Sequence, residues 1–62
     1  MKRIEIEGRT IYAAEFTNLN NAQTMTFHAS KPQRIILGDA PYYWVVTPAD
    51  AERLIRAGYE MA

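Results

Sequence analysis

The chain has 62 residues, and its seven Lys and Arg balance seven Asp and Glu to a formal net charge of zero. Residues 1–62 are long enough for one domain only, and the lack of Cys excludes disulfides, thiolate chemistry and Cys-ligated zinc. No apolar run approaches the ~18 residues of a membrane span, and residues 1–5 lack the apolar core of a signal peptide, so we expect a cytoplasmic protein.

Two strands joined by a tight turn are predicted at the start of the chain. Ile4 and Ile6 alternate with charged residues over residues 2–7, which is typical of a half-buried strand. Gly8 predicts a tight hairpin turn, and residues 10–17 continue as a second strand. A short helix is the alternative for this second segment, because its Ala-Ala-Glu sequence also favours helix.

A third strand is predicted over residues 23–29, after a loop formed by the Asn-rich residues 18–21. Met25 and Phe27 alternate with polar residues in this segment, and Pro32 ends it. The third strand is therefore expected to be apolar on one face.

A second hairpin is predicted from two runs rich in β-branched and aromatic residues, 34–37 and 42–47. Residues 38–41 have the sequence Gly-Asp-Ala-Pro, which predicts a four-residue loop between them. This loop length places Leu37 opposite Tyr42.

The last predicted element is a helix that begins after Thr47. The Thr47 hydroxyl can cap the free backbone N–H groups, Pro48 fits the first helical position, and Asp50 suits the helix dipole. Gly58 is placed for a left-handed C-terminal cap. The buried stripe of the helix is expected to contain Ala51, Leu54 and Ile55. The predicted fold class is α+β: a small antiparallel sheet of about five strands with one C-terminal helix packed on one face, in the order βββββα.

One helix covers one face of a sheet, so apolar residues on the other face need a different explanation. The bulkier group of the second hairpin, expected under the helix, is Ile35, Leu37, Tyr42, Trp44 and Val46. The group expected on the open face, and predicted as a protein interface because Tyr and Arg often anchor such surfaces, is Arg34, Ile36, Tyr43 and Val45. Trp44 replaces Tyr43 in this role if the faces are exchanged. A curled sheet with a larger core and a homodimer are the alternatives that would also cover this face.

Residues that carry catalysis or bind metals are sparse. His28 and Ser30 lie two apart on a predicted strand, where backbone positions are roughly 6.5–7 Å apart, so direct pairing of a nucleophile with a base is not expected. Glu5 and Glu7 share one strand face and are interpreted as exposed charges. A metal site needs about three or four ligands, and one His with scattered carboxylates does not supply them. We expect no enzyme activity, no metal and no cofactor.

The sequence therefore predicts a non-enzymatic module that binds a protein partner and acts by steric block. Single-stranded nucleic acid is the alternative ligand, because Tyr42, Tyr43 and Trp44 can stack bases. The balanced charge and the scattered basic residues argue against it, since phosphate binding needs a basic excess. A self-associating structural subunit, such as a homodimer, is a further alternative.

In general character the chain resembles the small accessory proteins of phages and mobile elements, of which the anti-CRISPR proteins are one group. The resemblance rests on the size, the lack of Cys, the strand-rich body and the ending in which Thr47 and Pro48 join a strand to a helix. It implies a stoichiometric inhibitor of a host complex of the CRISPR–Cas type, and it assigns no functional residues.

Overall fold

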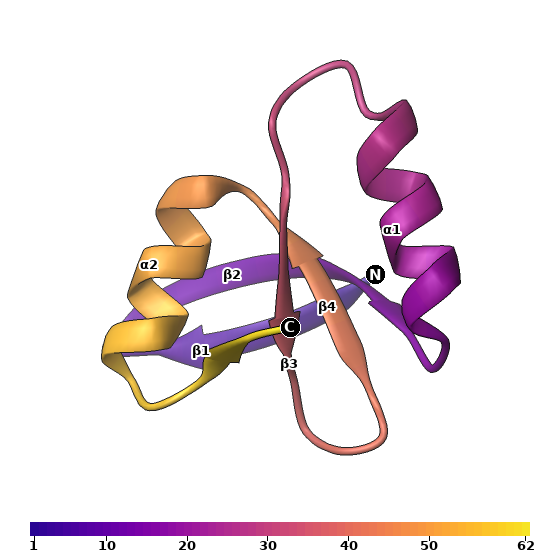
Figure 1. Ribbon diagram of the computed structural model, residues 1–62. Helices are drawn as coiled ribbons and strands as arrows, with labels where there is room; N and C mark the ends of the chain where they lie inside the picture. The colour runs from indigo at the N-terminus through magenta and orange to yellow at the C-terminus, as the bar shows by residue number, and fades with distance from the viewer.

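The computed structural model describes all 62 residues and contains one antiparallel sheet with two helices (Figure 1). In chain order the elements are β1 (Lys2–Ile6), β2 (Arg9–Phe16), α1 (Leu19–His28), β3 (Arg34–Leu37), β4 (Tyr43–Val46), α2 (Pro48–Arg56) and β5 (Glu60–Met61). The strands lie in the order β1-β2-β4-β3-β5, and every neighbouring pair is antiparallel. The α+β class and the five-stranded antiparallel sheet are confirmed.

The prediction of a single helix is wrong, because residues 23–29 do not form a strand. Most of this segment belongs to α1, which begins after Asn18, whose side-chain oxygen accepts a hydrogen bond from the Asn21 N–H at 3.3 Å. Ala22 is buried on the side of α1 that faces the sheet. The fifth strand is instead β5 at the end of the chain, which pairs with β3.

The first hairpin is confirmed, with residues 9–16 as a strand rather than a helix. Glu7 and Gly8 form its two-residue turn with φ of 49° and 75°. Positive φ at both central residues is the pattern of a type I′ turn, whose twist matches that of the two strands. Ile6 consequently lies opposite Arg9, and β1 and β2 pair along the whole of β1.

The second hairpin has a five-residue loop, so the predicted cross-strand register is wrong by one residue. Leu37 pairs with Tyr43, while Tyr42 belongs to the loop, where its N–H donates to the Asp39 carbonyl at 2.9 Å. The peptide bond between Ala40 and Pro41 in this loop is cis. Because the register moves, Ile36 lies opposite Trp44 and shares its face of the sheet.

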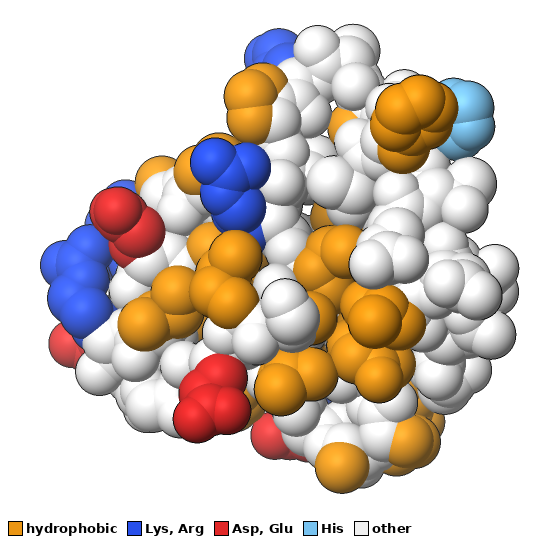
Figure 2. Space-filling view, in the orientation of Figure 1, with side chains coloured by type: hydrophobic (Ala, Val, Ile, Leu, Met, Phe, Trp, Pro, Cys, Tyr) orange, Lys and Arg blue, Asp and Glu red, His pale blue; other side chains and the backbone are white.

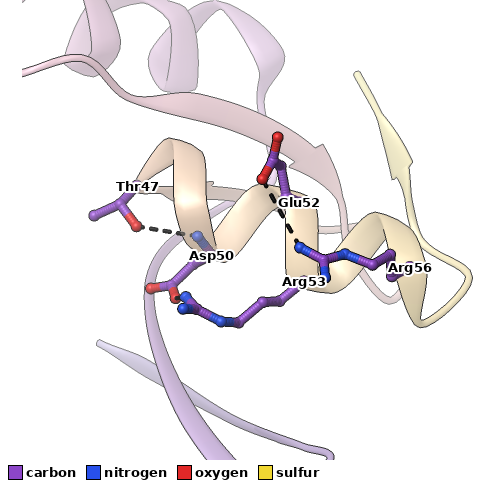
Figure 3. Close-up of polar contacts among 5 residues, drawn as sticks. All are labelled: Thr47, Asp50, Glu52, Arg53 and Arg56. Carbon is purple, nitrogen blue, oxygen red and sulfur yellow. Dashed lines mark hydrogen bonds and ion pairs between the residues drawn. The ribbon is translucent and has the colours of Figure 1, made fainter.

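The ends of α2 form as predicted. The Thr47 hydroxyl accepts a hydrogen bond from the Asp50 N–H at 3.2 Å (Figure 3), and Pro48 occupies the first turn. At the other end Gly58 has φ of 108°, and the N–H of Tyr59 donates to the Leu54 carbonyl at 3.0 Å. Together with the bond from the Gly58 N–H to the carbonyl three residues earlier, this is a Schellman cap.

The main core lies between the sheet and α2. It contains eight buried residues: Ile4, Ile11, Ala13, Ile36, Trp44, Val46, Ala51 and Leu54. The predicted buried stripe of α2 is thus confirmed for Ala51 and Leu54, but Ile55 is exposed. Helix α1 contacts β2, β3 and β4 from the other face, where Ala22 and Val45 are buried apart from this cluster. The two helices lie on either side of β3 and β4 (Figure 1).

Candidate protein-binding surface

Three of the five predicted interface residues are buried. Ile36, Trp44 and Val45 expose 0%, 1% and 3% of their surface. Trp44 lies under α2 as the main prediction placed it, so its alternative role as an interface residue is not supported. Ile36 joins it there because of the shifted register, and Val45 lies on the face that α1 covers. The prediction that Ile36 and Val45 belong to an open apolar patch is therefore wrong. The physical causes are the unrecognised helix, which covers Val45, and the longer loop, which moves Ile36 to the other face.

Arg34 and Tyr43 remain accessible, but the structure does not bring them together. Tyr43 pairs with Leu37 at the loop end of the second hairpin, whereas Arg34 pairs with Val46 at the opposite end. The Arg34 guanidinium is exposed and donates to the neighbouring Gln33 carbonyl at 3.0 Å. The two residues are on opposite faces of the sheet, so any role in binding must be separate for each.

An apolar hollow of about 290 Å³ lies at the β3–β4 loop. We call it the β3–β4 hollow, and it is lined by Leu37, Gly38, Ala40, Pro41, Tyr42 and Tyr43. Leu37 and Tyr42 expose 39% and 38% of their surface, and Tyr43 is half-buried. An exposed apolar group of this kind, with two Tyr side chains, is typical of protein interaction sites.

The loop that forms the hollow packs on the side chain of Trp44. A Cβ atom at Gly38 would overlap the Trp44 indole, so glycine is needed for this close approach. The Trp44 ring packs on Tyr59 with centroids 5.2 Å apart, and its Nε1 donates to Glu15 at 3.1 Å. Gly38, which lines the hollow, therefore packs directly on a residue of the main core.

Tyr59 links the end of α2 to this loop. Its hydroxyl donates a long hydrogen bond of 3.5 Å to the Asp39 carboxylate. Burial, and then the charge of Asp39 and this hydrogen bond, raise the pKa of Tyr59 above its ordinary value of 10.0. The phenol is thus neutral at physiological pH and serves as a structural donor.

Two acidic residues lie next to the β3–β4 hollow. Asp39 belongs to the loop itself, and Glu60 on β5 lies directly across from Leu37. In Figure 2 acidic side chains border the apolar group at the lower end of the molecule, while Lys and Arg side chains lie above it and to the left. The hollow thus combines an apolar floor with an acidic rim.

Sequence reasoning missed this surface because it placed Leu37 and Tyr42 under the helix. The available signal was the pair of large apolar residues that directly flank the turn sequence Gly-Asp-Ala-Pro. Loops lie on the surface, so apolar side chains at their ends are often exposed there. The length of the loop decides whether Tyr42 belongs to the strand, and the residue types in this segment do not determine that length.

A second hollow of about 310 Å³ lies between the β1–β2 turn and α2, and it is largely polar. Its lining consists of Ile6, Glu7, Arg9, Arg53 and Arg56. Arg53 donates to Asp50 at 2.8 Å, and Arg56 lies 3.8 Å from Glu52 (Figure 3). Two of its three guanidinium groups therefore have carboxylate partners on their own helix, near whose C-terminal end a positive charge is stabilising.

The residues considered for acid–base chemistry are dispersed. His28 ends α1 and packs edge-on against Phe27 at 5.3 Å, while Ser30 lies in the following loop. Glu5 accepts hydrogen bonds from the Thr10 hydroxyl at 3.0 Å, and Glu7 belongs to the first turn. These side chains are all exposed.

No group of three or more His, Cys, Asp or Glu is arranged to hold a metal ion. Neither helix combines the length and the apolar character that crossing a membrane requires. Comparison of the chain with protein-family models, with curated proteins and with solved structures gives no match.

Proposed function

We propose that this protein is a non-enzymatic binding module that docks on a protein partner through the β3–β4 hollow. The observation that carries the proposal is the exposed apolar group of Leu37, Tyr42 and Tyr43 around a preformed depression. Preformed sites bind with a smaller loss of conformational entropy than flexible ones. The close packing of Gly38 on the buried Trp44 ring supports such a role.

The acidic rim indicates the chemistry of the partner. Asp39 and Glu60 favour a segment in which a large apolar side chain enters the hollow and Lys or Arg residues flank it. The same negative charge opposes a phosphate backbone, and Trp44, the largest stacking side chain, is buried. These features favour a protein over single-stranded nucleic acid. The proposed action is steric: the bound module blocks the partner surface that it covers.

Capture from a cell lysate by the immobilised protein tests the proposal when it is read with matched variants. Tyr42→Ala should lose the partner, because it removes a large apolar contact from the hollow. Tyr12→Ala is the control: Tyr12 exposes 57% of its surface on β2 and does not line the hollow, so this variant should retain the partner. Glu60→Lys should weaken capture, and added nuclease should leave it unchanged.

The proposal is contradicted if Tyr42→Ala and Tyr12→Ala capture the same proteins in the same amounts. Capture that disappears on nuclease treatment would instead assign nucleic acid as the ligand. Thermal melting of each variant separates loss of binding from loss of folding, and Tyr42→Ala should melt within a few degrees of the wild type because its side chain lies in an exposed loop.

A further inference from the structure

The edge of the sheet formed by β1 is free along its whole length. β1 ends the strand order and pairs only with β2. The opposite edge strand, β5, has two residues, whereas β1 has five. A free strand edge is a template for pairing with another chain, so β1 offers the longer of the two docking edges.

The outward backbone groups of this edge belong to Arg3 and Glu5. The two-residue turn places Ile6 in a hydrogen-bonded pair with β2. Hydrogen-bonded and non-hydrogen-bonded pairs alternate along an antiparallel ladder, so Ile4 also bonds to β2. The N–H and C=O groups of Arg3 and Glu5 therefore point away from the sheet.

Few two-fold symmetric registers align these outward groups with those of a second copy. One register places Arg3 opposite the second copy's Arg3, and another places Glu5 opposite Glu5. Like charges directly opposite each other destabilise a strand pair. The central register places Arg3 opposite Glu5 twice and Ile4 opposite Ile4. Among the residues of β1 it alone forms two pairs of opposite charge, since Glu7 belongs to the turn.

We propose that β1 pairs with β1 of a second copy in this central register, joining the two sheets into one. Arg3 and Glu5 are largely exposed in the single chain, and their side chains lie 3.8 Å apart on the same face. In the dimer each of them gains a partner of opposite charge across the new strand pair. On the other face Lys2 lies opposite the half-buried Ile6, which its aliphatic stem can cover.

A charge-exchange experiment tests this register. Arg3→Glu gives an edge with two acidic residues, and Glu5→Arg gives an edge with two basic residues. Each variant alone should raise the dimer dissociation constant about tenfold or more, because both opposite-charge pairs become like-charge pairs. An equimolar mixture should form a one-to-one heterodimer, since every Glu then faces an Arg. Misfolding of either variant cannot produce this result.

The measurement is sedimentation equilibrium from about 10 μM to about 1 mM, because one strand pair makes a small and weak interface. Lys31→Glu and Glu52→Arg are controls with the same charge changes at exposed positions away from β1, and both should dimerise as the wild type does. Amide exchange at Arg3 and Glu5 should slow as the wild-type concentration rises. A wild type that stays monomeric at the highest concentration overturns the proposal. So does a mixture that associates no better than its components.

Discussion

The two faces of the sheet differ in how many residues they bury. The face under α2 holds a contiguous cluster of eight buried residues, whereas the face under α1 buries only Val45 and, on the helix, Ala22. α2 has a Thr cap, a Pro in its first turn and a Schellman motif. α1 has an Asn cap and no acidic residue in its first turn, and its hydroxyls at Thr24 and Thr26 bond back to carbonyls four residues earlier.

Because of this difference, the α2 face contributes most to the stability of the fold, whereas the α1 face leaves more apolar side chains exposed. The α2 face supplies most of the apolar burial that holds the fold. The α1 face carries exposed residues such as Met25 and Phe27, the latter exposing 84% of its surface. The β3–β4 hollow is next to both faces: Gly38 in its lining packs on Trp44 of the α2 face, while Tyr43 and Leu37 belong to the α1 face. The hollow is thus joined to the main core through Gly38.

The largest expected change in stability comes from removing one buried side chain from each face of the sheet. Trp44→Ala should lower the free energy of unfolding by about 3–5 kcal/mol, because it opens the main core. Val45→Ala should cost about 2 kcal/mol, since it removes two carbon atoms from the thinner layer under α1. Urea unfolding followed by circular dichroism measures both. Equal losses would show that the α1 face contributes as much as the α2 face.

The two helix caps give a matched pair of smaller changes. Thr47→Ala and Asn18→Ala each remove a side-chain acceptor from a backbone N–H, at 3.2 Å in α2 and 3.3 Å in α1. Thr47→Ala should cost about 1 kcal/mol of global stability. Asn18→Ala should act mainly on α1, whose amides should exchange faster while those of α2 change little. Hydrogen exchange followed by NMR decides this, and an equal response of both helices to Asn18→Ala would contradict it.

The smallest expected effect is a loss of stability at alkaline pH through Tyr59. Its pKa is raised in the folded state, first by burial and then by the charge of Asp39, so the unfolded chain loses this proton at lower pH than the folded one. The contribution is fully present below pH 10.0 and declines as the pH rises through the folded value. Urea midpoints at about pH 8.5 and about pH 10.5 should differ less in Tyr59→Phe than in the wild type. An identical pH response in both proteins would be evidence against this contact.

Local signals in the sequence were sufficient for the first hairpin and for α2, because Gly8, Thr47, Pro48 and Gly58 each act on the backbone next to them. They were insufficient for α1. Its Met and Phe alternate with Thr, which has the period of a strand, while the face that packs on the sheet is marked by a single small residue, Ala22. The Asn18 cap was the available signal for this helix.

The sequence predicted the type of residue in the candidate site but not which of these residues are exposed. Aromatic residues near residues 42–44 were recognised as binding candidates, but which of them is exposed depends on the loop length. A one-residue change of register exchanges the partners across a hairpin and hence the residues that share a face. Ile36 joined Trp44 in the core for this reason, while Tyr42 and Leu37, which were expected under the helix, are exposed. The pairing between β2 and β4 could not be predicted from local sequence signals either, because the two strands are far apart in the sequence.

The pairing of β2 with β4 has a consequence for the time course of folding. The β1–β2 and β3–β4 hairpins are each local and can form within microseconds, independently of each other. The sheet becomes continuous only when Ala14 meets Val45, which closes a loop of about thirty residues that includes α1. That closure is the step whose contacts are most distant along the chain. A flexible insertion in the segment between α1 and β3 should therefore slow folding more than it speeds unfolding.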